Sequence, residues 1–109
     1  MSLDVTFTAL AEPSRRGVIE LLRKEPRRAG ELADALGLSA PAMSRHLKVL
    51  RAAGLVERAF DEDDARANVY RLKQERFAEL RDWLEDVERF WTRQLAAFAQ
   101  HAEKRRDRR

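Results

Sequence analysis

The residues of this 109-residue chain that are best suited to chemistry lie in one short stretch, residues 39–50. In a helix, Ser44, Arg45 and Lys48 would lie on one broad face. An arginine guanidinium can donate two parallel hydrogen bonds to O6 and N7 of guanine, and a lysine ammonium binds phosphate. The pattern therefore predicts a helix that enters the major groove of DNA.

The same stretch carries its own signals for a helix. Ser39 can accept a hydrogen bond from the free amides at a helix start, and Pro41 fits the first turn. Met43, Leu47 and Leu50 then follow at a spacing of four and three residues, which makes one apolar face. We expect one face of this helix to pack against the core and the opposite face to present hydrogen-bond donors to an external partner.

The surrounding elements are expected to position this helix. Residues 30–36 have the pattern of a short helix, and Gly37 follows where a helix cap favours a left-handed backbone, so a helix-turn-helix is expected over about residues 29–53. Two strands with an acidic turn between them predict a wing over about residues 55–72. The predicted fold is mainly α with a small β-hairpin, a single winged helix-turn-helix domain over residues 1–109.

Helices are expected at both ends of this unit, at about residues 3–11 and 74–100, before a basic tail at 103–109. The second helix has an aromatic stripe, and a large exposed apolar stripe usually marks an interface, so we predict a homodimer. The alternative is that the stripe folds back on the rest of its own chain. The expected interface residues are Leu3, Phe7, Leu10, Leu80, Trp83, Leu84, Val87, Phe90, Trp91, Leu95 and Phe98.

A homodimer could place two recognition helices in successive major grooves, about 34 Å apart, and read an inverted repeat. Ser44 and Arg45 are the expected base-reading residues, and Lys48, Arg51 and Arg28 are expected near phosphates. The expected contacts from the recognition helix are Ser39, Ala40, Pro41, Ala42, Ser44, Arg45, His46, Lys48 and Arg51. Those expected from the wing and its flank are Arg28, Arg58, Arg66 and Asn68.

Composition limits the class of protein. Hydrophobic residues make up 44% and charged residues 38% of the chain, with a formal net charge of +3, which is typical of a folded and highly soluble protein. No apolar run reaches the roughly 18 residues of a membrane span and no signal segment opens the chain, so a cytoplasmic location is expected.

Neither an enzyme nor a pure interaction module explains the pattern as well as a DNA-binding protein. The sequence has no nucleophile and base set, no phosphate-binding glycine loop and no paired acids, so no catalytic activity is expected. The alternative is a winged-helix protein-interaction module with weak or no specific DNA binding. Ser44, Arg45 and Lys48 argue against that alternative.

An ordered series of short motifs gives the chain a family resemblance. The series is AEPSRR at 11–16, VIELL at 18–22, GELA at 30–33, SRHLKVL at 44–50, AGLV at 53–56 and YRL at 70–72. It resembles the ArsR-type winged-helix repressors over roughly residues 5–72. That resemblance implies a homodimeric bacterial transcriptional repressor that binds near its own promoter and is released by a signal, either a small molecule or a protein.

The chain resembles a branch of that family without cysteine metal sites. It contains no cysteine, and only His46 and His101 could supply imidazole ligands. His46 lies inside the DNA-reading motif, where a hydrogen-bonded or packing role is the simpler interpretation, and His101 stands alone near the end. Neither a metal site nor a cofactor is therefore expected.

Four acidic residues at 61–64 occupy the expected tip of the wing. Acidic side chains repel phosphate if they point into the minor groove. Two arrangements remain open from the sequence: the tip stands away from DNA, or the acids pair with neighbouring arginines.

Overall fold

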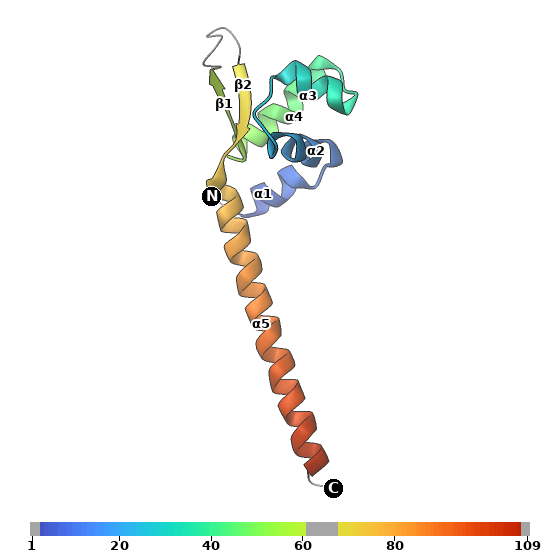
Figure 1. Cartoon of the computed structure of the whole chain (residues 1–109), viewed down its shortest axis with the longest axis vertical. Helices are drawn as coiled ribbons and strands as arrows, with labels where there is room; N and C mark the ends of the chain where they lie inside the picture. The colour runs from blue at the N-terminus through green and yellow to red at the C-terminus, as the bar shows by residue number, and fades with distance from the viewer. Residues whose placement is uncertain (1–2, 61–67, 108–109) are drawn as a thin grey trace. The chain divides into compact units, whose positions relative to one another are not determined.

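The computed structural model describes residues 3–60 and 68–107. The order of the elements is α1 (Leu3–Leu10), α2 (Pro13–Leu22), α3 (Ala29–Leu36), α4 (Ala40–Ala52), β1 (Val56–Phe60), β2 (Asn68–Leu72) and α5 (Gln74–Asp107), as Figure 1 shows. The prediction of a mainly helical winged helix-turn-helix fold with one hairpin is confirmed. Two compact units make up the chain, Met1–Ala78 and Glu79–Arg109, and each is described by itself.

The core of the first unit joins the helices to the hairpin. Val18 of α2, Leu32 of α3 and Leu50 of α4 have no exposed surface, and Leu55 and Tyr70 close the core from the hairpin side. In α4 the buried residues Met43, Leu47 and Leu50 recur at helical spacing, so burial in that helix follows from the sequence period.

Local signals set the ends of the helices as expected. The Oγ of Ser39 accepts a hydrogen bond from the backbone N–H of Ala42 at 3.2 Å and so caps α4. Gly37 after α3 and Gly54 after α4 have φ of 66° and 76°, in the left-handed region where residues with a Cβ are strained. These two glycines therefore allow the sharp turns on either side of α4.

The strands β1 and β2 pair in antiparallel register, with Glu57 opposite Arg71 and Arg58 opposite Tyr70. Tyr70 also pairs on its other side with Arg27, since its N–H donates to the Arg27 carbonyl at 2.7 Å and its carbonyl accepts from the Arg27 N–H at 3.1 Å. The segment before α3 is thereby fixed to the hairpin, a contact between distant residues that the sequence pattern did not predict.

The last helix is longer than the sequence analysis expected. The end was expected near residue 100, but α5 continues to Asp107. No glycine or proline interrupts this stretch, and Lys104, Arg105 and Arg106 lie in the last turn, where cations interact favourably with the helix dipole. The part of the chain that the structure describes contains no helix long and apolar enough to span a membrane.

Candidate nucleic-acid interface

The recognition helix α4 has two faces with different roles. Met43 and Leu47 are buried, with at most 2% of their surface exposed, and fix the helix to the core. Ser44, Arg45 and Lys48 are exposed on the other face. Within the described residues no hydrogen bond or ion pair engages these three side chains, so their donors are available to an external partner.

The first turn of α4 allows close approach. Ala40 and Pro41 are exposed and short, and Ala42 is half-buried. The oxygen of Ser39 accepts one hydrogen bond in capping the helix, so this side chain keeps its O–H donor and one further lone pair. A DNA backbone or base edge can therefore reach the start of the helix without meeting a bulky group.

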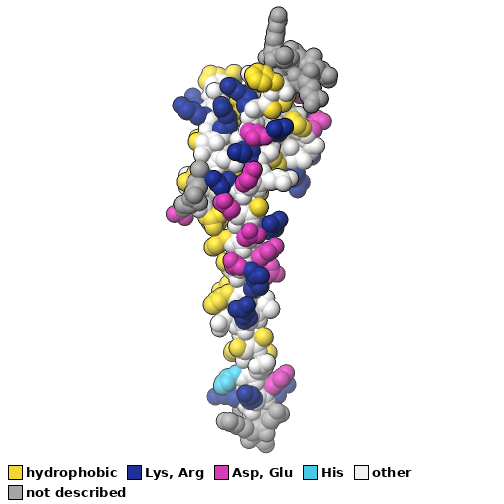
Figure 2. Space-filling model, turned by 90° about the vertical axis from the view of Figure 1, so that its left-hand side faces the viewer, with side chains coloured by type: hydrophobic (Ala, Val, Ile, Leu, Met, Phe, Trp, Pro, Cys, Tyr) yellow, Lys and Arg dark blue, Asp and Glu magenta, His cyan; other side chains and the backbone are white. Residues whose placement is uncertain are grey.

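A hollow of about 540 Å³ lies beside the C-terminal half of α4 and the strand β1. Its cationic lining residues are Lys48, Arg51, Arg58 and Lys73, and the others are Ala52, Val56 and Glu57. Glu57 is paired with Arg71 across the strands, with Nε and Oε1 2.6 Å apart, so the four cations are not neutralised by it. Figure 2 shows Lys and Arg side chains gathered over this part of the molecule. The hollow has the charge that a phosphate requires.

The remaining residues expected to contact DNA are partly described. Arg28 is exposed at the start of α3, and its backbone N–H donates to Oε1 of Glu31 at 3.2 Å. Asn68 is exposed at the start of β2, opposite Phe60. Arg66 and the four acidic residues at 61–64 lie outside the described residues.

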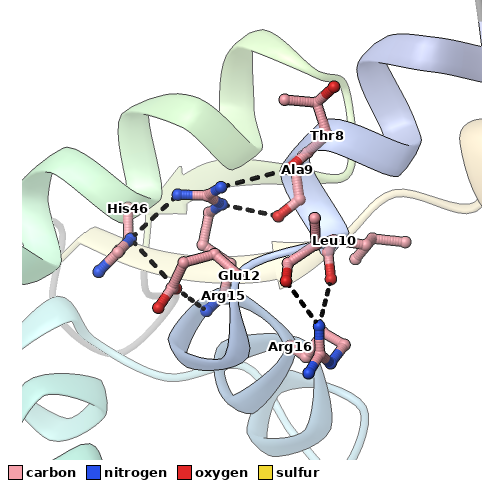
Figure 3. A network of polar contacts seen from close by, with 8 residues as sticks. Thr8, Ala9, Leu10, Glu12, Arg15, Arg16 and His46 are labelled. Carbon is pink, nitrogen blue, oxygen red and sulfur yellow. Dashed lines mark hydrogen bonds and ion pairs between the residues drawn. The ribbon is translucent and has the colours of Figure 1, made fainter.

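His46 differs from its neighbours on α4 because its imidazole contacts other parts of the protein (Figure 3). Its Nδ1 lies 3.4 Å from Nη1 of Arg15 and 3.7 Å from Oε2 of Glu12, and the side chain is 20% exposed. This placement agrees with the hydrogen-bonded role considered in the sequence analysis.

The carboxylate of Glu12 faces cations and amide donors. Partial burial raises the pKa of Glu12, but the hydrogen bonds from the backbone N–H groups of Ser14 and Arg15 and the nearby cations together outweigh it and lower the pKa. These cations are the imidazole of His46 when it is protonated and the guanidinium of Arg15. Glu12 therefore stays ionised to a lower pH than an ordinary glutamate.

The structure adds two residues that the sequence analysis missed. Lys73 follows the last wing strand and is one of the residues that line the basic hollow. The other lining residues lie 15 or more positions earlier in the sequence. Arg15 contacts α1 and α4 simultaneously. The only local signal for Lys73 was a basic residue directly after a predicted strand. Arg15 belongs to the family motif AEPSRR at 11–16, but the motif does not indicate which residues Arg15 contacts.

The residues expected at a dimer interface are mostly accessible. On α1, Phe7 is 41% exposed, whereas Leu3 and Leu10 are half-buried and Leu10 packs against the core. On α5, Leu80 and Val87 are half-buried. The other side chains of the α5 stripe are exposed: Trp83 43%, Leu84 51%, Phe90 55%, Trp91 59%, Leu95 66% and Phe98 71%. In Figure 2, hydrophobic side chains follow one flank of α5 and acidic and basic side chains lie beside them.

A second apolar surface lies on the first unit. Val5 and Thr8 of α1 and Val49 and Ala52 of α4 line an open groove of about 360 Å³. Val5 and Val49 are 42% and 39% exposed, so the groove has an apolar lining that solvent reaches. The groove continues the exposed side of α1 onto the recognition helix.

The described residues contain no donor set that fits a resident metal ion. The sequence has no cysteine. Among residues 3–60 and 68–107, no three His, Asp or Glu side chains gather in a way that could hold a metal. A tetrahedral zinc site needs such a cluster of nitrogen, sulfur or carboxylate ligands.

The helices α3 and α4 are followed by a hairpin, and α4 is capped and has an exposed cationic face. These features define a winged helix-turn-helix DNA-binding domain. Residues 12–58 match the family described as "Bacterial regulatory protein, arsR family". The chain is 43% identical over 99 residues to the HTH-type transcriptional regulator Rv2034 of Mycobacterium tuberculosis, and this alignment covers 91% of the chain and 87% of the relative. The chain belongs to the arsR family, and it is a DNA-binding transcriptional regulator rather than an enzyme.

Solved structures agree with this assignment. An ArsR-like transcriptional regulator from Rhodococcus sp. RHA1 aligns with a TM-score of 0.79 and 32% identity, covering 94% of this chain and 91% of that one. The winged helix-turn-helix domain of Mb0332 from Mycobacterium bovis aligns with a TM-score of 0.63 and 27% identity, covering 79% of this chain and 77% of that one. That domain is described as homodimeric and as a possible ArsR-family regulator.

Proposed function

We propose that the protein is a homodimeric transcriptional repressor that reads an inverted repeat through α4. The observation that carries the proposal is the exposed face of α4, where Ser44, Arg45 and Lys48 are unpaired within the described residues while Met43 and Leu47 hold the opposite face in the core. Arg45 reads guanine through two parallel hydrogen bonds, and Ser44 contacts a neighbouring base edge.

Phosphate contacts set the position of the helix on DNA. Lys48, Arg51, Arg58 and Lys73 surround the basic hollow, and Arg28 provides a further cation at the start of α3. Such contacts give affinity and register but carry no sequence information. Arg66 and Asn68 complete the proposed wing contacts.

Dimerisation places two copies of α4 on one side of the duplex. The exposed stripe of α5 supplies the main proposed surface, and each of its aromatic side chains has about 200 Å² to bury. Four such side chains, exposed by about half in each protomer, contribute about 800 Å² across two copies before the leucines are added. This approaches the lower threshold of about 1,000 Å² for a biological interface. Phe7 and the exposed side of α1 are a second proposed surface for the dimer. The homodimer described for the Mycobacterium bovis domain supports the proposal.

Repression follows from occupancy, since a dimer bound across a promoter excludes RNA polymerase. The test is binding to a duplex from the region upstream of its own gene, in competition with a random duplex of equal length, over a range of salt concentrations. We expect a preference for the upstream duplex and a steep linear fall of log affinity with log salt. Absence of any preference at every salt concentration would instead favour a protein-interaction module.

The dimer has an independent test, the mass in solution by sedimentation at micromolar concentration. Twice the chain mass of 12.7 kDa is expected. A mass near one chain would mean that the α5 stripe finds its partner within its own chain.

A further inference from the structure

One arginine connects three helices of the first unit. Arg15, in the first turn of α2, donates from Nε to the Ala9 carbonyl at 2.6 Å and from Nη2 to the Thr8 carbonyl at 3.2 Å. Both carbonyls belong to the last turn of α1, where backbone acceptors lack the usual helical partner. The Thr8 carbonyl also accepts from the backbone N–H of Ala11 at 3.3 Å. Figure 3 shows the guanidinium between this end of α1 and His46 on α4.

The third contact of Arg15 reaches the recognition helix. Its Nη1 lies 3.4 Å from Nδ1 of His46. A guanidinium only donates, so Nδ1 must accept, which requires a neutral imidazole with its proton on Nε2. Glu12 lies on the other side, with Oε2 3.7 Å from the same Nδ1 and 3.0 Å from the backbone N–H of Arg15. His46 is therefore held by α2 and, through Arg15, by α1.

The planar shape of the side chain matters for this connection. Arginine has five N–H donors in a rigid fork, whereas lysine has one flexible ammonium. A lysine could satisfy a carbonyl of α1 or approach His46, but it could not hold both in a fixed geometry.

We propose that Arg15 is a positioning residue for DNA recognition, which fixes the orientation of α4 relative to α1 through His46. This inference rests on the proposed function, in which α1 contributes to the dimer and α4 reads the bases. Half-sites on DNA lie about 34 Å apart, so both recognition helices must keep one orientation relative to the dimer interface. His46 directly follows Arg45 in the chain, so a shift at His46 moves the base-reading side chain.

The variant Arg15→Lys tests the connection, and Arg16→Lys is its matched control. Nη1 of Arg16 donates to the carbonyls of Leu10 and Ala11 at 2.8 and 3.0 Å, so Arg16 also binds the end of α1. Among the described residues, none of its hydrogen bonds reaches α4. We expect Arg15→Lys to weaken binding to the preferred duplex about tenfold, which corresponds to the loss of a hydrogen bond to a charged group. Binding by Arg16→Lys should stay within about twofold of the parent, since no contact to α4 changes.

Variants of His46 separate positioning from general stability, because they leave the bonds of Arg15 to α1 intact. His46→Ala should weaken binding as Arg15→Lys does. His46→Asn should restore most of the affinity, since its amide oxygen can accept from Arg15 in place of Nδ1. Combining Arg15→Lys with His46→Ala should cause no further loss, because both changes break the same contact.

Several results would overturn the inference. Equal effects of Arg15→Lys and Arg16→Lys, additive effects of Arg15→Lys and His46→Ala, or no rescue by His46→Asn would each exclude a positioning role. A smaller salt dependence for Arg15→Gln, which removes the positive charge, would show that Arg15 contacts phosphate instead. If Arg15→Lys fails to fold, the pair His46→Ala and His46→Asn decides alone. If the parent protein prefers no duplex, the proposed function fails before any variant is compared, and this inference fails with it.

Discussion

Replacing Lys73 tests whether the basic hollow holds a DNA phosphate. Lys73 lines this hollow with Lys48, Arg51 and Arg58, and Lys73→Gln removes one cation from each protomer. Each phosphate contact contributes about 0.9 to the slope of log affinity against log salt, so two contacts per dimer reduce the slope by about 1.8. Between about 50 and about 200 mM salt, the variant should therefore lose about tenfold less affinity than the parent protein.

The assay is a fluorescence-anisotropy titration with the preferred duplex and a random duplex at several salt concentrations. Lys73→Gln should weaken binding to both duplexes alike, since phosphate contacts carry no sequence information. Arg23→Gln is the control, because it also removes one charge per protomer but at an exposed ion pair with Glu20 on α2. An unchanged slope for Lys73→Gln, or an equal change for Arg23→Gln, would refute the assignment of the hollow.

Four further predictions test separate parts of the account. Arg45→Gln should reduce the preference for the operator over random duplex by about 1–3 kcal/mol, measured by competition binding. Trp91→Glu should place a charge in the proposed interface and give a sedimentation mass near the 12.7 kDa of one chain. Leu47→Ala should lower the free energy of unfolding in urea by about 2–5 kcal/mol, because Leu47 is buried and leaves a cavity. Because the pKa of Glu12 is lowered, the ionised carboxylate stabilises the fold fully above the usual glutamate pKa of 4.5. This contribution is lost as pH falls through the lowered pKa. The difference in unfolding free energy between the parent protein and Glu12→Gln should therefore shrink in that pH range.

The elements could be predicted from the sequence because their signals are local. Ser39, Gly37 and Gly54 mark helix ends through their own side chains or backbone, and the apolar spacing of α4 fixes which face is buried. The same periodicity identified the exposed face with Ser44 and Arg45. The element order and the cationic face were sufficient to predict the class of protein.

What the sequence could not show depends on contacts between distant residues. The hollow requires Lys73 to lie beside Lys48, and the pairing of Arg27 with Tyr70 joins residues 43 positions apart. The contact of Arg15 with His46 likewise depends on how α2 crosses α4. Periodicity assigns a residue to a face but does not identify its neighbours on another element.

The length of α5 shows a different limit. A charged segment after residue 100 resembled a terminal tail, because charge runs are common in such tails. Good helix formers without glycine or proline, together with basic residues in the last turn, extend the helix to Asp107.

The most direct test of the central claim is a hydroxyl-radical footprint of the full chain on a duplex enriched from a random library. Two protected blocks with inverted sequences are expected, with their centres about one helical turn, or about 34 Å, apart. If Arg45→Gln loses the base preference at one symmetric position in each block, the contact with that base is made by Arg45 of α4. Enrichment of no sequence, or protection of a single block without symmetry, would contradict a homodimer that reads DNA through α4.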